Sequence, residues 1–200
     1  AASPLIGEEY QSRFPHLQIT IMNNAFESSL QHPFQVVSAR PLKLVWFSQV
    51  IGLDRGLTEF FHGLKPLEDE PITITLIGQC PDQVSIDLKA ALTSDKHQLV
   101  VLPPMNEQDL TKELSGHHIG LALETSKTLN RRLCRTNKLY MYPLSGCITL
   151  ASSTPAQDDF FQQHPQCGQI FRNPDEILQG LKPHILESSE INQSRKAAWT

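Results

Sequence analysis

The sequence predicts an α/β protein with a Rossmann-like open parallel sheet and helices on both of its faces. From Lys43 onward, short apolar runs alternate with amphipathic segments, as strands alternate with crossover helices in parallel sheets. The 200 residues are enough for one domain with a full hydrophobic core. No apolar run approaches the roughly 18 residues of a membrane span. These observations favour a globular sheet protein.

Each predicted strand is a largely apolar run of seven or eight residues that ends in turn-forming residues. The five strands expected are Leu42 to Gln49, Pro71 to Gly78, His97 to Pro104, His117 to Glu124 and Cys147 to Ser153. Helices are expected at 56–67, 83–94, 106–116 and 136–145 and from Pro155 onward, where apolar residues recur at helical spacing. Ligands of such sheets bind outside the carboxyl ends of the strands, so the residues that follow each strand are the candidates for a site.

The first forty residues do not follow this alternation. A helix is expected at residues 8–14 and a strand at 17–24, in a layer of their own, before a proline-bearing connector. We therefore interpret 1–40 as the tail of a preceding domain with a linker, 41–186 as the ligand-binding domain, and 187–200 as a polar C-terminal tail. This tail is either frayed or a helix that returns to a preceding domain.

The charge balance and the cysteine spacing argue against some classes of function. The chain has 17 basic and 21 acidic residues, so there is no overall basic field for nucleic acid. The four cysteines are 54, 13 and 20 residues apart, which matches no paired zinc or redox spacing, and we expect no metal site. Isolated thiols indicate a reducing compartment, so we expect a cytoplasmic protein. Peripheral association of the full-length protein with the inner face of the membrane stays open.

The loop after the first predicted strand could hold a phosphate group. Gly52 and Gly56 allow a tight turn, and Arg55 between them adds a fixed positive charge at the start of a helix. The spacing is that of neither a dinucleotide-binding glycine motif nor a P-loop. An ordinary β–α turn is the alternative.

Two further strand ends carry candidate ligands. Pro104 and Met105 after the third strand could hold a flat ring, although a turn capped by Asn106 explains the same residues. Glu124 at the end of the fourth strand could accept hydrogen bonds from sugar hydroxyls, or be a solvated strand end. His117 and His118 are adjacent, so they point to opposite faces of a strand and cannot chelate one metal.

The segment from Asn130 to Cys147 is the most informative. If residues 136–145 form one helix capped by Thr136, four cations lie at its N-terminal end: Arg131, Arg132, Arg135 and Lys138. The helix dipole repels cations at that end, and an anion bound to Lys138 and the free backbone N–H groups would cancel the repulsion. Solvated cations, or cations paired with carboxylates, are the alternative.

Several of these segments, in this order, resemble the donor-binding half of GT-B glycosyltransferases. They are "LVWFSQVIGLDRGL", "ITLIG", "HHIGLALE" and "NRRLCRTNKLYMYPLSGCITLASSTPAQ". The similarity runs from about Lys43 to Ile185 and is strongest to the retaining branch, which includes glycogen synthases and sugar transferases of cell-surface polysaccharides. It implies one of the two Rossmann-like halves of a GT-B fold.

The resemblance also implies roles for particular residues. Many members of that branch have two glutamates separated by seven residues, where this sequence has Asn130 and Lys138 instead. Lys138, with Asn137 beside it, would contact the diphosphate or ribose, and Asn130 the sugar hydroxyls. The loop with Gly52 and Arg55 would face the phosphates, while Pro104 and Met105 would hold the base and Glu124 would complete the donor site. No catalytic residue is assigned.

The function implied is transfer of a sugar from a UDP- or GDP-type donor. The nucleotide sugar is a substrate, so no cofactor is expected, and a glycan or lipid-linked acceptor would be held by a preceding domain that this chain lacks. Alone, the chain would bind donor feebly and transfer nothing. Two alternatives stay open: a related enzyme such as a nucleotide-sugar epimerase or a phosphorylase, and a non-catalytic ligand-binding or docking module.

Overall fold

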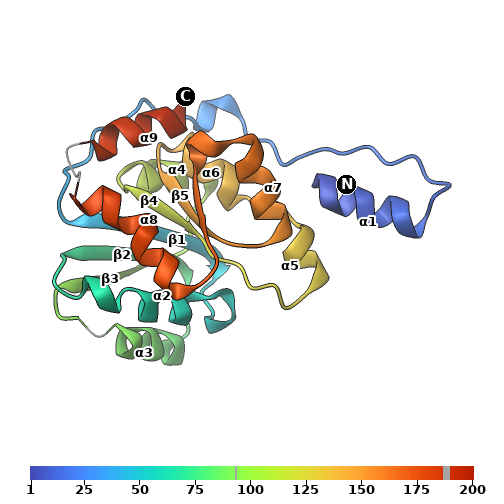
Figure 1. Ribbon diagram of the computed structural model, residues 1–200. Helices are drawn as coiled ribbons and strands as arrows, with labels where there is room; N and C mark the ends of the chain where they lie inside the picture. The colour runs from blue at the N-terminus through green and yellow to red at the C-terminus, as the bar shows by residue number, and fades with distance from the viewer. Residues whose placement is uncertain (93, 187–189) are drawn as a thin grey trace.

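The computed structural model describes residues 1–92, 94–186 and 190–200. At its centre is a parallel sheet of six strands in the order β3-β2-β1-β4-β5-β6 (Figure 1). The strands are β1 (Leu42–Val50), β2 (Ile72–Gln79), β3 (His97–Leu102), β4 (Ile119–Ala122), β5 (Ile148–Ser152) and β6 (Gly168–Phe171). The predicted α/β class and the five predicted strands are confirmed. The sequence did not reveal β6, because it has four residues and begins with Gly168 and Gln169.

Helices cover both faces of the sheet, as predicted. One face packs against α2 (Leu57–Gly63), α3 (Asp82–Ala91) and α8 (Pro174–Leu186), and the other against α4 (Glu107–Ser115), α6 (Lys138–Leu144) and α7 (Pro155–Gln163). Alternation along β1 shows why: Leu44 and Trp46 belong to the first core, and Val45 to the second. The helix expected at 83–94 ends at Ala91, and residue 93 lies outside the described residues.

Shorter elements join this framework. A five-residue helix, α5 (Leu129–Leu133), follows β4, and α9 (Ile191–Trp199) ends the chain. The 3₁₀ turns are η1 (Ser28–Leu30), η2 (Leu53–Arg55), η3 (Lys65–Leu67) and η4 (Pro165–Cys167).

Tyr142 fixes helix α6 on the sheet. Its ring lies directly over Gly120 of β4, where an added Cβ would be 2.1 Å from the ring, and its hydroxyl donates to the Leu121 carbonyl oxygen at 3.0 Å. Any larger residue at position 120 would lift the helix. This contact sets the position of the N-terminal residue of α6, Lys138.

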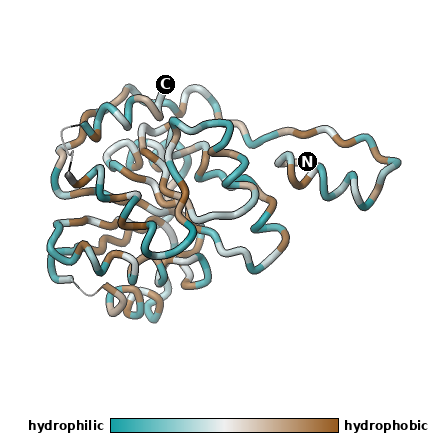
Figure 2. The backbone as a smooth tube through the Cα atoms, viewed as in Figure 1, coloured by the Kyte–Doolittle hydropathy of each residue, from teal (hydrophilic) through white to brown (hydrophobic). Residues whose placement is uncertain are grey.

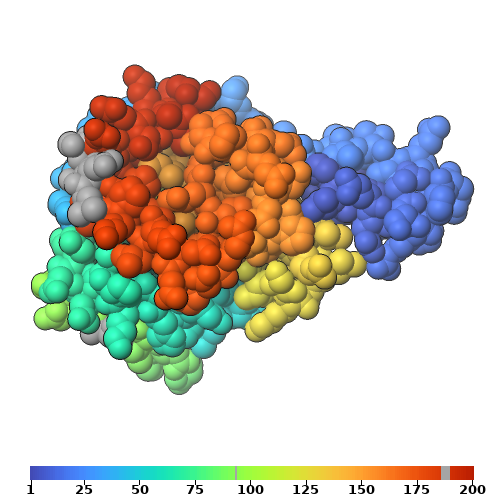
Figure 3. All heavy atoms as spheres, viewed as in Figure 1, coloured from blue at the N-terminus to red at the C-terminus, as the bar shows by residue number. Residues whose placement is uncertain are grey.

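The N-terminal segment forms an arm beside the sheet domain. Helix α1 (Pro4–Arg13) confirms the expected helix, and the chain then runs back along it without regular structure to residue 27. Figures 1 and 3 show this arm standing out from the body. The strand expected at 17–24 is wrong: although its residues alternate, the described part of the chain provides no strand to pair with them. Ile21 and Met22 are exposed instead, and Figure 2 shows hydrophobic segments, in brown, along the arm.

The C-terminal residues that the structure describes are neither frayed nor detached. Residues 191–199 form α9, which lies against α6 and η4. Arg195 is fully buried there and donates to the carbonyl oxygens of Gln35 and Ser115, each at 2.8 Å. This segment looks polar in the sequence because the buried cation of α9, Arg195, bonds to backbone carbonyl oxygens. Residues 187–189 of the expected tail lie outside the described residues, and the domain boundaries stay predictions.

Candidate functional site

A cavity of about 280 Å³ lies at the carboxyl edge of the sheet. It is bounded by the ends of β1 and β2, the loop after β3, and the start of α4 and α6. Four of the residues expected from the sequence line it together: Pro104, Met105, Asn137 and Lys138. Asn106 also caps α4 by accepting from the Asp109 backbone N–H at 2.9 Å. The capped turn and the cavity wall are therefore the same structure.

Lys138 is buried although it carries a charge. Its side chain is 8% exposed, and its Nζ lies 5.2 Å from the Trp46 ring centre and 5.5 Å from that of Phe47. Aromatic faces attract a cation, which partly replaces its lost hydration. Burial lowers the pKa of Lys138 to about 8, while the nearby Glu124 carboxylate raises it. The ammonium is therefore shielded from bulk water, and Lys138 lines the cavity.

Arg55 and Lys138 share one carboxylate. Arg55 donates to both oxygens of Glu124, at 2.9 and 3.1 Å, and Lys138 Nζ lies 3.9 Å from Glu124 Oε1. The Glu124 side chain is 2% exposed, so it is not the solvated strand end of the alternative interpretation. Arg55 and Lys138 together carry one more charge than Glu124, and the Glu107 side chain, which is exposed, also lines the cavity. The Arg55 side chain is 32% exposed, but neither Arg55 nor Glu124 lines the cavity.

The turn that carries Arg55 depends on glycine. The loop forms the 3₁₀ turn η2, and Gly56 follows with φ of +82°, a left-handed conformation that glycine adopts without strain. Helix α2 starts directly afterwards, at Leu57. Gly56 therefore shapes the loop. Gly52 directly precedes η2 and adopts an extended conformation.

The expected helix at 136–145 is shorter, and the expected cap is wrong. Helix α6 begins at Lys138 with Asn137 as N-cap residue, and the Thr136 hydroxyl is buried without a hydrogen-bond partner among the described residues. The backbone N–H groups of Leu139 and Tyr140 bond to the carbonyl oxygens of Thr136 and Asn137. The tight turn before the helix thus uses donors that we expected to be free for an anion.

The four clustered cations differ in their partners. Arg131 pairs with Asp54 at 2.6 Å and Arg135 with Asp159 at 2.5 Å, whereas exposed Arg132 makes no ion pair within the described ranges. For Arg131 and Arg135 the simpler interpretation, pairing with carboxylates, holds. Lys138 alone of the four lines the cavity at the sheet edge.

Asn130 does not join the other expected residues. It is exposed on α5 and lines a separate cavity between α5 and the arm. Helix α5 separates from α6 at Cys134, so residues eight apart in sequence do not lie on one helix. The sequence spacing between Asn130 and Lys138 therefore does not bring the two side chains to one site.

Other residues of the cavity were not found by sequence reasoning. Phe47 and Ser48 line it beside Gln49 at the end of β1, and Met141 lines it one turn after Lys138. The rule that sites lie beyond strand ends pointed to Gln49 but not to the last strand residues themselves. Trp46 read as an ordinary core residue, and its contact with Lys138 depends on how α6 lies over the sheet.

His117 lies beside another cavity, separate from the one described above. A cavity of about 580 Å³ runs along α4 and includes His117 and Lys43. Both nitrogens of His117 are used, by the Glu113 carbonyl oxygen at 3.0 Å and the Thr75 hydroxyl at 2.9 Å, and burial lowers the pKa of His117 to about 4. His117 is therefore a neutral packing residue. Among the described residues, no group of three or more His, Cys, Asp or Glu could hold a metal ion.

Comparisons with known proteins bear on the fold. The sequence matches no family model and no curated protein sequence. The structure is similar to sucrose-phosphate synthase from Thermosynechococcus elongatus, with a TM-score of 0.74, 11% identity, and coverage of 100% of this chain and 51% of that one. A TarM variant from S. aureus gives a TM-score of 0.69 and 12% identity, covering 98% of this chain and 39% of that one.

A third similar structure is Anabaena HepE in complex with UDP-glucose. Its TM-score is 0.64 at 12% identity, and the match covers 90% of this chain and 51% of that one. This chain thus spans about half or less of the length of these proteins. At such identities the likeness shows the fold alone, and the fold is that of one half of a GT-B glycosyltransferase, as the sequence led us to expect.

Proposed function

We propose that the chain binds the nucleoside diphosphate part of a nucleotide-sugar donor, as the donor half of a glycosyltransferase. The observation that carries the proposal is the cavity at the carboxyl edge, with the incompletely neutralised Lys138 in its wall. Structures similar in fold were solved with UDP or UDP-glucose, which favours this class of ligand. Transfer itself would need an acceptor domain in addition to this chain.

The residues divide the donor between them. Lys138 and Arg55 would neutralise the diphosphate, while Pro104 and Met105 would hold the base against the end of β3. As the bond to the sugar breaks, negative charge grows on the departing diphosphate, and fixed cations stabilise that charge more than the ground state. The cavity of about 280 Å³ is near the lower limit for small-molecule sites, so it suits part of the donor. The sugar would lie outside it, toward the acceptor.

Glu124 has a different role in this proposal from the one its position suggested. Its carboxylate is already bonded to Arg55 and lies beside Lys138, so it holds the two cations in place and need not contact sugar hydroxyls. A diphosphate in the cavity would meet Lys138, and Arg55, which does not line the cavity, would act on it from behind Glu124. Fixing charges before the ligand arrives is what makes such a site effective.

Isothermal titration calorimetry tests the proposal. The chain is titrated with UDP, GDP, UMP and inorganic phosphate, and Lys138→Met is titrated in parallel. We expect a nucleoside diphosphate to bind more tightly than UMP or phosphate, and Lys138→Met to weaken it. Equal indifference to every nucleotide would contradict the proposal and favour a docking module. Nucleotide binding that does not change in Lys138→Met would refute the site.

A further inference from the structure

We propose that the cavity at the carboxyl edge of the sheet prefers a guanine base, and that Glu107 determines this preference. The inference rests on the donor-binding function proposed above and names its nucleotide. Glu107 is the first residue of α4, its side chain is exposed, and it lines the cavity two residues after Met105. A carboxylate therefore lies on the wall that the base would contact.

The Glu107 carboxylate is free to accept hydrogen bonds from a ligand. Within the described ranges its side chain makes no hydrogen bond and no ion pair, whereas Asp109 in the same helical turn accepts from the Asn106 side chain at 2.7 Å. The positive end of the α4 dipole stabilises a negative charge at this position. The carboxylate can thus accept two hydrogen bonds, one at each oxygen.

The cavity carries opposite charges on two different walls. Lys138 begins α6 and Glu107 begins α4, and the carboxylate within ion-pair distance of Lys138 is that of Glu124, not Glu107, among the described residues. Like charges repel, so a diphosphate would lie against Lys138 and away from Glu107. This orientation directs the other end of the nucleotide, the base, toward Glu107.

The other lining residues accommodate a flat ring without distinguishing between bases. Besides Pro104 and Met105, the apolar side chains of the wall are Phe47, Ile77, Leu110 and Met141. Ser48, Gln49 and Asn137 are neutral and have both donor and acceptor atoms, so they fit the polar edge of any base. An ionised carboxylate only accepts hydrogen bonds. Glu107 is therefore the lining residue that distinguishes one base from another.

Guanine is the base whose edge matches a carboxylate. Its N1–H and N2–H groups are neighbouring donors that point in the same direction, so both can bond to the two oxygens of Glu107. Uracil has one N–H group between two carbonyl oxygens, and these oxygens repel a carboxylate. Adenine and cytosine each have an amino group beside a ring nitrogen that accepts. Hydrogen bonds to a charged partner are stronger than neutral ones, so the carboxylate favours guanine. UDP would still bind through Lys138, but more weakly.

Calorimetry with GDP, inosine diphosphate and UDP tests the proposal. Inosine diphosphate differs from GDP only in lacking the N2 amino group, so this comparison isolates one of the two hydrogen bonds. We expect GDP to bind the wild type about tenfold more tightly than either of the others, because a charged hydrogen bond contributes that much. In Glu107→Gln, the carboxamide has one donor and one acceptor, which match O4 and N3–H of uracil. GDP should bind this variant about tenfold more weakly than the wild type, and UDP at least as tightly.

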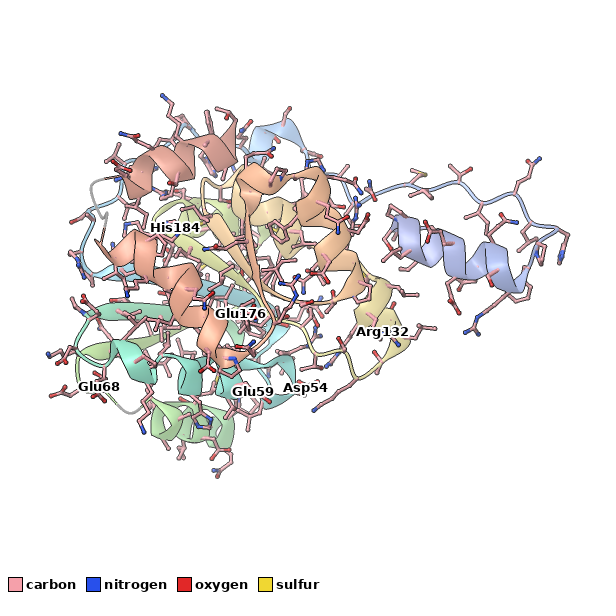
Figure 4. All side chains as sticks on the ribbon, viewed as in Figure 1. Asp54, Glu59, Glu68, Arg132, Glu176 and His184 are labelled. Carbon is pink, nitrogen blue, oxygen red and sulfur yellow. The ribbon has the colours of Figure 1, made fainter. Side chains whose placement is uncertain are left out.

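Glu68→Gln is the matched control. It removes the same charge from an exposed glutamate that precedes β2, at the amino edge of the sheet, whereas the cavity lies at the carboxyl edge. Figure 4 shows Glu68 well away from Asp54, which belongs to the loop after β1. The affinities of this variant for all three nucleotides should equal those of the wild type.

The outcomes separate this inference from the donor function. If the wild type binds GDP and inosine diphosphate equally well, Glu107 does not select the base, and the inference is wrong while the donor function stands. The same holds if Glu107→Gln weakens all three nucleotides equally, because Glu107 would then act on the ribose or diphosphate that they share. If the wild type binds none of the three, the donor function is wrong and the inference fails with it.

Discussion

Arg135 and Lys138 are three residues apart, and both cations are buried against aromatic rings, but they differ in their partners. Arg135 is the cation paired with Asp159, at 2.5 Å, and lies over Phe160, with its side chain 3% exposed. Lys138 is 3.9 Å from a carboxylate that Arg55 already holds with two shorter contacts. Arg135 and Asp159 form a structural ion pair. Lys138 is incompletely neutralised and can bind an anionic ligand. Clustering of cations in the sequence does not distinguish them, whereas the sharing of a carboxylate does.

The largest effect is expected where the structural pair is broken. Arg135→Ala leaves Asp159, which is 30% exposed, with Gln163 but no cation and removes the contact with Phe160, and we expect the lost charged hydrogen bond and packing to lower the free energy of unfolding by about 3 kcal/mol. Chemical denaturation measures this loss. UDP affinity should be unchanged. A large loss of UDP affinity at full folding would mean that Arg135 belongs to the site.

Removing the charge of Lys138 should have opposite effects on stability and binding. Burial lowers the pKa of Lys138 from 10.5 to about 8, so below pH 8 the ammonium destabilises the folded state relative to the unfolded one. The penalty disappears as the pH rises to the unfolded pKa. At pH 7, Lys138→Met should therefore raise the free energy of unfolding, by about 3 kcal/mol at most.

The same variant should bind UDP roughly 30-fold more weakly, because a charged hydrogen bond contributes about 2 kcal/mol. Denaturation and calorimetry on one protein preparation measure both quantities. Lys138→Met that is less stable and binds UDP normally would show that Lys138 is a structural cation like Arg135.

The pH dependence of UDP binding should distinguish the two cations further. Above pH 7 the terminal phosphate is ionised, so changes in affinity there do not come from the phosphate groups. Affinity should be level up to about pH 8, the pKa of Lys138, and then fall by up to tenfold per pH unit as the ammonium loses its proton.

Glu124→Gln provides the control for this pH profile. The Glu124 carboxylate raises the pKa of Lys138, so its removal should move the fall in affinity to lower pH. A profile that stays level to pH 10 would contradict the role of Lys138. If the pH midpoint of the fall in affinity is the same in Glu124→Gln as in the wild type, Glu124 does not act on Lys138 as proposed.

The smallest effect is expected at Arg132, the exposed member of the cluster. Arg132→Ala should change the free energy of unfolding by less than about 0.5 kcal/mol and leave UDP affinity unchanged, because its side chain has no ion pair in the described part of the chain. Denaturation and calorimetry are again the measurements. A clear loss of UDP binding would show that the cationic cluster acts as a whole.

Much of the sheet could be predicted because its evidence is local. Apolar runs such as that of β1 predicted the strands, and the strand-end rule pointed to Pro104 and Met105, which line the cavity. The errors share another cause. Residues 17–24 alternate like a strand but have no neighbour to pair with in the described chain, and β6 is too short for its pattern to stand out.

The site was harder to predict, because its electrostatics depend on distances between distant segments. Lys138 and Glu124 are fourteen residues apart, and Arg55 is 69 residues from Glu124. Nothing in the spacing shows that one carboxylate serves both cations. The turn at Asn137, which uses backbone donors of α6, likewise depends on where Tyr142 meets Gly120.

NMR titration of the Lys138 side chain, with and without UDP, tests the central claim most directly. Its resonance is identified as the one that is lost in Lys138→Met. We expect a pKa of about 8 in the free protein and a clear increase in that pKa when UDP is bound, because the diphosphate stabilises the ammonium. A Lys138 pKa that is the same with and without saturating UDP would contradict the claim that this lysine holds the diphosphate.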